Sequence, residues 1–94
     1  MITLEVLQKR MSQLNDWSLE EKKILKEFTF KDFKESILFT NQVAEIAERL
    51  YHHPTILISF NTVRIELTTH ELSDLTEKDF DVAQEIDKIN LDID

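Results

Sequence analysis

The chain contains three histidines, and all of them lie between residues 52 and 70. His52 and His53 are adjacent, at the predicted junction of a long helix and a strand. His70 follows the second strand of the hairpin that comes next, and a hairpin returns the chain to near its starting point. Histidine suits proton transfer near neutral pH, because its unperturbed pKa is roughly 6.5. The cluster therefore indicates general acid–base chemistry.

Two other interpretations of these histidines stay open. Isolated histidines are often partly buried polar residues, or surface residues without a role. A metal site is the second, with Glu48, four residues before His52, as a further ligand. Adjacent histidines rarely bind one ion, because their side chains diverge by roughly 100° on a helix or 180° on a strand. The spacing also matches none of the usual zinc patterns, so metal binding is less favoured.

Apolar periodicity predicts the elements that must position the histidines. Residues 3–15 carry a narrow apolar stripe typical of a helix, with Thr3 as its N-cap. Residues 17–30 alternate as a strand, paired with a short strand near their start. Residues 32–50 form the longest predicted helix, which Pro54 ends because the residue before a proline is disfavoured in helical geometry.

The second half of the chain predicts two strands and a helix. Residues 55–60 and 62–69 read as the strands, with Asn61 as a turn residue that tolerates left-handed geometry. The helix begins with Thr76 as N-cap and the acidic Asp79 at its third position. The expected fold is α+β in the order α-β-β-α-β-β-α, a single four-stranded antiparallel sheet with three helices packed on one face. The aromatic residues expected in the core are Trp17, Phe28, Phe30, Phe33 and Phe39.

Length and charge limit the function. Ninety-four residues predict one domain, residues 1–94. The 19 acidic against 11 basic residues give a net charge of −8, which argues against nucleic acid and against an anionic membrane surface. No apolar run is long enough to span a membrane, the N-terminus lacks a signal-peptide pattern and cysteine is absent, so we expect a cytoplasmic protein. A neutral small molecule is the expected ligand.

The segment from Glu48 to Pro54 resembles the signature of the pterin-4a-carbinolamine dehydratases. That signature is a glutamate, three residues, His-His-Pro, and a third histidine 17 residues after the second, as from His53 to His70. The resemblance extends over about residues 15–90. Members often have glycine in the loop after the third histidine and tryptophan just after the proline; this chain has neither. The further matching segments are 28–33, 60–63, 67–70 and 75–79.

The resemblance implies a dehydratase that converts 4a-hydroxytetrahydropterin to quinonoid dihydropterin and water, recycling the pterin cofactor of aromatic amino-acid hydroxylases. Imidazoles can supply the acid and the base, so neither metal nor cofactor is expected. The resemblance also implies roles for individual residues. His52 and His70 would transfer protons, and His53 would bind substrate and share the acid role. Glu48 would orient an imidazole or bind the pterin, and the pocket would be lined by Tyr51, Thr68 and Thr69.

Two further expectations concern assembly and an alternative function. The family resemblance implies a tetramer, and a chain this small gains stability from association. We therefore expect a homo-oligomer, a tetramer or a dimer. The last helix, with Ile86 and Ile89, is the expected contact. Some animal members also act as dimerisation cofactors. The alternative is thus a non-catalytic interaction module of the same fold, although a pure scaffold would have no need of three histidines.

Overall fold

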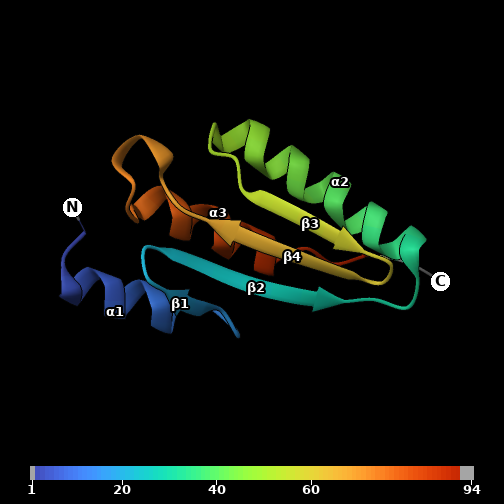
Figure 1. The fold of residues 1–94 in the computed structure, drawn as a ribbon, viewed down its shortest axis with the longest axis horizontal. Helices are drawn as coiled ribbons and strands as arrows, with labels where there is room; N and C mark the ends of the chain where they lie inside the picture. The colour runs from blue at the N-terminus through green and yellow to red at the C-terminus, as the bar shows by residue number, and fades with distance from the viewer. Residues whose placement is uncertain (1, 92–94) are drawn as a thin grey trace.

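The computed structural model describes residues 2–91, and its elements follow the predicted order (Figure 1). A short 3₁₀ helix, η1, is added between the last strand and the last helix. The elements are α1 (Leu4–Ser12), β1 (Ser18–Glu20), β2 (Lys23–Thr29), α2 (Phe33–Leu50), β3 (Thr55–Ser59), β4 (Thr62–Leu67), η1 (His70–Leu72) and α3 (Glu77–Asp87).

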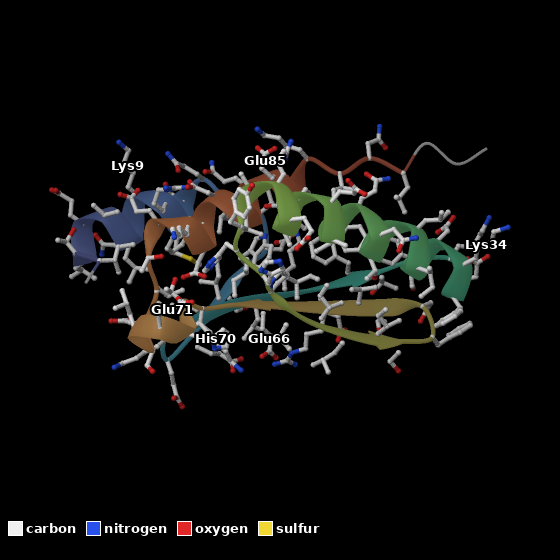
Figure 2. All side chains as sticks on the ribbon, turned by 90° about the horizontal axis from the view of Figure 1, so that it is seen from above. Lys9, Lys34, Glu66, His70, Glu71 and Glu85 are labelled. Carbon is white, nitrogen blue, oxygen red and sulfur yellow. The ribbon has the colours of Figure 1, made fainter. Side chains whose placement is uncertain are left out.

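The four strands form one antiparallel sheet in the order β1-β2-β4-β3, and the helices lie on one of its faces (Figures 1 and 2). This confirms the predicted α+β architecture. β4 is central, and its side chains alternate between the two faces. Val63, Ile65 and Leu67 are fully buried under the helices, whereas Arg64 and Glu66 face away from them. The other sheet face is therefore open and polar at its centre.

Local interactions fix the helix starts as the sequence predicts. The Thr3 side chain accepts a hydrogen bond from the Val6 backbone N–H, and the Asp32 side chain accepts one from that of Glu35. These bonds satisfy amide groups that have no partner within the helix. Thr76 is the N-cap of α3, with Asp79 at the third helical position.

The first helix is shorter than predicted. α1 ends at Ser12 rather than at residue 15. The chain then turns, and the Asn15 backbone N–H donates to Oδ2 of Asp87, the last residue of α3, over 3.2 Å. The Trp17 indole N–H donates to Oδ1 of the same carboxylate over 2.9 Å. These long-range contacts compete with continued helix and are invisible to local periodicity.

One expectation about a turn is confirmed in part, and one about the core is wrong. Asn61 lies in the β3–β4 turn as predicted, but Phe60 holds the left-handed position, with φ 49°. Asn61 instead donates its amide to the Phe30 carbonyl, and its backbone carbonyl accepts from the Phe30 N–H, which ties the hairpin to the residue that follows β2. Phe33 was expected in the core but is 52% exposed, as the first residue of α2. Trp17 and Phe39 are buried as predicted, and Phe28 and Phe30 pack against that core.

Candidate active site

The end of α2 fixes the position of His52. Tyr51 adopts left-handed geometry, with φ 53° and ψ 40°. Its N–H bonds to the Glu48 carbonyl, and the His52 N–H bonds to the Ala47 carbonyl over 3.1 Å. This pair of bonds is the Schellman arrangement, which satisfies the last helical carbonyls. The backbone of His52 is therefore part of the helix terminus rather than of a loose loop.

The imidazole of His52 is held by a carboxylate that the sequence reasoning did not place in the site. His52 is 9% exposed, and its Nε2 lies 2.6 Å from Oδ1 of the fully buried Asp79. The other oxygen, Oδ2, accepts from the Thr69 hydroxyl and from the Thr76 N–H, each over 2.9 Å. Three donors suit a carboxylate, which can only accept. Nε2 of His52 then carries the proton, and Nδ1 is the nitrogen left for a ligand.

A chain of hydroxyl groups completes this network. The Thr69 and Thr76 hydroxyls lie 2.7 Å apart. Because Thr69 gives its single hydroxyl proton to Asp79, Thr76 must donate to Thr69. The end of β4, the first turn of α3 and the end of α2 thus meet at one buried carboxylate, which makes the position of His52 depend on all three.

His52 opens into a hollow of about 550 Å³, a size typical of small-molecule sites. The buried polar group at its base is His52, with Thr69 beside it. Its rim is mixed: Tyr51 is 86% exposed and Leu72 is 60% exposed, and charged side chains lie between them. The full lining is Tyr51, His52, Thr69, Glu71, Leu72, Thr76, Glu77 and Lys78.

His53 and Glu48 form a second pair just outside this hollow. Nε2 of His53 lies 2.5 Å from Oε2 of Glu48, and both side chains are mostly exposed. The pair shares the α2–β3 junction with His52, so the structure brings Glu48, Tyr51 and both adjacent histidines together. Their roles in substrate binding stay proposals.

The structure places His70 and Thr68 on the other side of the β4 end. Successive residues of a strand point to opposite faces, so Thr69 faces His52 whereas Thr68 faces the open side. Thr68 and the exposed His70 line a separate hollow of about 440 Å³, together with Lys23. Figure 2 shows His70 and Glu66 on the side of the sheet away from the helices. Within one chain, His52 and His70 therefore line neighbouring hollows rather than a shared one.

A charged network borders the His70 hollow. Glu66 accepts a hydrogen bond from Lys23 over 3.0 Å and one from Arg64 over 2.8 Å. The hydrogen bond from Lys23, aided by Arg64, lowers the pKa of Glu66 against the opposing effect of burial. Glu66 thus stays charged into mildly acidic solution and holds both cations on the open face of the sheet.

Sequence reasoning missed Asp79, Thr76 and Leu72 as site residues. The sequence predicts Asp79 at the third position of the last helix, and the structure confirms that position. The same carboxylate also serves as the partner of His52, 27 positions away in sequence. The one available signal was an acidic residue at a helix start not far beyond the third histidine.

No three histidine, cysteine, aspartate or glutamate side chains gather closely enough to hold a metal ion anywhere in residues 2–91. No helix in that part of the chain is both long enough and apolar enough to cross a membrane.

These features define a class: a small α+β domain whose sheet end carries a carboxylate-held histidine facing a ligand-sized hollow. A sequence profile described as Pterin 4 alpha carbinolamine dehydratase matches residues 1–89. The chain is 49% identical over 84 residues to a protein of Trichormus variabilis whose name assigns it provisionally to the pterin-4-alpha-carbinolamine dehydratases, covering 89% of this chain and 90% of that one. A similarly named protein of Sulfolobus acidocaldarius is 40% identical over 83 residues, covering 88% and 91%. The chain belongs to the pterin-4-alpha-carbinolamine dehydratase family.

Solved structures agree with this assignment. A transcriptional coactivator/pterin dehydratase from Brucella melitensis superposes with a TM-score of 0.84 at 31% identity, covering 92% of this chain and 94% of that one. A pterin dehydratase-like protein described as a RuBisCO assembly factor of the alpha-carboxysome matches with a TM-score of 0.66 at 23% identity, covering 80% and 89%. The second likeness concerns the fold alone.

Proposed function

We propose that the chain is a dehydratase that converts 4a-hydroxytetrahydropterin to quinonoid dihydropterin and water. The observation that carries the proposal is the buried Asp79 that holds Nε2 of His52 at the base of the hollow. A carboxylate behind an imidazole fixes its orientation and tautomer, which is the arrangement that general acid–base catalysis needs. A buried, oriented imidazole that faces an open hollow favours catalysis over a non-catalytic module.

The reaction requires two proton movements and no change of oxidation state. The C4a–O bond breaks as an acid gives a proton to the leaving hydroxyl, and a base removes a proton from a ring nitrogen. In the proposal His52 and His70 transfer these protons, which requires the pterin to lie across the β4 end, between the two hollows that these histidines line. Only Nδ1 of His52 is free for this work, because Asp79 occupies Nε2.

The remaining residues bind the substrate in this proposal. His53, oriented by Glu48, contacts the pterin and shares the acid role. Tyr51, Thr68 and Thr69 line the site, with the two threonines on the two sides of the β4 end. The proposal needs neither metal nor cofactor. It places the enzyme in the cytoplasm as a homo-oligomer that recycles the pterin cofactor of aromatic amino-acid hydroxylases.

The alternative is an interaction module of the same fold. The Brucella melitensis structure carries both coactivator and dehydratase in its title, so the two functions need not exclude each other. Catalysis is favoured here because the chain has all three histidines of the family signature and because one of them is held by a buried carboxylate.

The test is direct. Purified protein is added to enzymatically generated 4a-hydroxytetrahydropterin, and the decay of its ultraviolet absorbance is followed with and without a chelator. We expect faster decay than in buffer, insensitive to the chelator. Lys9→Ala, on the exposed face of α1, is the matched control and should keep the full rate. A decay no faster than in buffer would exclude the dehydratase; loss of activity on chelation, restored by zinc, would exclude the metal-free mechanism.

A further inference from the structure

Two exposed apolar side chains flank the hollow that contains His52. Tyr51 is 86% exposed and Leu72 is 60% exposed, and both line this hollow. Single exposed apolar residues are common on protein surfaces, so exposure alone decides nothing. These two are distinguished by sharing one hollow with a buried, carboxylate-held imidazole. Neither side chain contributes much to the core of its own chain.

The backbone under Tyr51 is costly for the residue it carries. Tyr51 occupies the left-handed position that ends α2, where glycine is normally found. A residue with a Cβ atom adopts this geometry less readily than glycine does. Phe60 shares the geometry and is also exposed, at the β3–β4 turn, so Tyr51 is distinguished by its place at the hollow of His52.

Leu72 is presented by a closed and well-bonded turn. Thr69 and Asp74 pair through both backbone amides, over 2.9 and 3.4 Å. Within the turn, the Leu72 N–H bonds to the Thr69 carbonyl over 3.1 Å, and Ser73 takes left-handed geometry with φ 49°. This turn is the one that lacks the usual glycine. Leu72 is therefore held at the rim by a bonded frame rather than by a loose loop.

We propose that Tyr51 and Leu72 form an apolar clamp that holds the bicyclic pterin over His52. The proposal rests on the proposed function and adds the residues that set affinity for the ring system. A bicyclic pterin presents polar edges and less polar faces. The polar base of the hollow suits the edges, and the two apolar side chains suit the faces. Tyr51 and Leu72 are then affinity-determining residues that take no part in proton transfer.

The variants follow from the geometry. Tyr51→Gly removes the ring and suits the left-handed backbone, so its melting temperature should equal or exceed that of the parent protein. Phe60→Gly is its matched control, because Phe60 is also exposed, at 66%, and also left-handed, but lies at the β3–β4 turn. Leu72→Ala is matched by Leu4→Ala, at a site 69% exposed on α1.

The measurements are the Kd for 6-methyl-7,8-dihydropterin, which cannot be dehydrated, and the KM and kcat for the carbinolamine. We expect Tyr51→Gly and Leu72→Ala each to raise Kd and KM by about 2- to 10-fold, the range of an aromatic or apolar ring contact. The kcat should stay within about twofold, and the two controls should match the parent.

The outcomes separate the clamp from the dehydratase activity. Unchanged Kd in both variants, with an active parent, would overturn the clamp and leave the activity standing. A second outcome is that the parent binds the dihydropterin without turning over the carbinolamine, and the two variants bind it more weakly. That result would support the clamp and overturn the activity. A parent that neither binds nor reacts would overturn both.

Discussion

At the scale of single residues, His52 differs from the other two histidines in its burial and in its hydrogen-bond partner. It is buried and bonded to Asp79, whereas His53 and His70 are exposed. An imidazole fixed on one nitrogen presents the other in a constant direction and tautomer. His70 lies on a 3₁₀ turn and has no such partner among the hydrogen bonds of residues 2–91.

Replacement of these histidines separates proton transfer from binding. We expect His52→Ala and His70→Ala each to lower kcat by about 10²–10⁴-fold, the usual contribution of a general acid or base. His53→Ala should mainly raise KM, as expected for a group that binds substrate and transition state alike. Stopped-flow absorbance of the carbinolamine measures both constants.

The double replacement is the decisive variant. The carbinolamine loses water unaided, so single variants can retain activity when water or another imidazole substitutes. His52→Ala combined with His70→Ala should approach the uncatalysed rate, with circular dichroism unchanged. A folded double variant as active as the parent would refute the histidine mechanism.

Asp79 gives a second prediction at this scale. Asp79→Asn replaces one carboxylate oxygen with an NH₂ group, which donates and cannot accept. The side chain can then no longer accept from His52, Thr69 and Thr76 together. A buried unsatisfied donor costs about 1–3 kcal/mol, so we expect that loss in urea-measured unfolding free energy. The kcat should fall too, because His52 loses its fixed tautomer. Asp81→Asn, on the exposed face of the same helix, is the control for stability and should cost less. An Asp79→Asn variant with parental kcat would show that the carboxylate is purely structural.

At the scale of elements, the end of β4 organises both hollows. Its alternation sends Thr69 towards α3 and Thr68 towards the open face, where the Thr68 hydroxyl donates to the Lys22 carbonyl over 2.7 Å. The strand is held on this face by Glu66, which pairs with Lys23 of β2. The tie between β2 and β4 is therefore partly electrostatic, and it depends on pH.

The pH dependence follows from the lowered pKa of Glu66, whose main cause is the hydrogen bond from Lys23. Because the pKa is lower in the folded than in the unfolded chain, Glu66 stabilises the fold above its unfolded pKa. That contribution disappears as the pH falls through its folded pKa. We expect Lys23→Met to cost about 0.5–1 kcal/mol at pH 7, a typical value for a partly exposed pair. The cost should shrink towards zero in acid.

Urea unfolding of parent and variant at a series of pH values measures this difference. Lys9→Met, which removes a charge of the same sign from α1, is the control and should show no such convergence. A cost for Lys23→Met that stays constant from neutral to acidic pH would show that Glu66 is not its origin.

At the scale of the whole molecule, the sheet has two free edges, and β3 is the longer of the two edge strands. Leu57 and Ile58 of this strand are 53% and 38% exposed. An exposed apolar edge strand tends to pair with another chain. The expected contact through Ile86 is wrong, because Ile86 is 1% exposed and lies in the core of its own chain. Ile89 lies beyond the end of α3 and is partly buried against the same core, and a contact through it stays a prediction.

We therefore predict a homo-oligomer, a tetramer or a dimer, in which β3 is a contact. Light scattering at micromolar concentration should give a mass above the 11.2 kDa of one chain. Leu57→Lys should lower that mass, because charge on an edge strand opposes pairing, whereas Leu4→Lys on α1 should not. A monomer mass for the parent protein would contradict the prediction.

The sequence by itself determined the order of the elements, the fold class and the cluster of histidines. Helix periodicity, strand alternation and capping residues such as Thr3 and Thr76 act over a few positions, so they can be recognised locally. The family motif between Glu48 and His70 also lies in one short stretch of chain.

Tertiary structure alone decided which groups meet. Three contacts follow from packing between elements far apart in sequence: Asp79 holds His52, Asn61 ties the hairpin to the end of β2, and Asn15 bonds to Asp87. Tertiary structure also placed His70 on the opposite side of the β4 end from His52. A shift of one residue along a strand moves a side chain to the other face of the sheet. Such contacts depend on how the sheet and helices pack, which no local pattern of residues encodes.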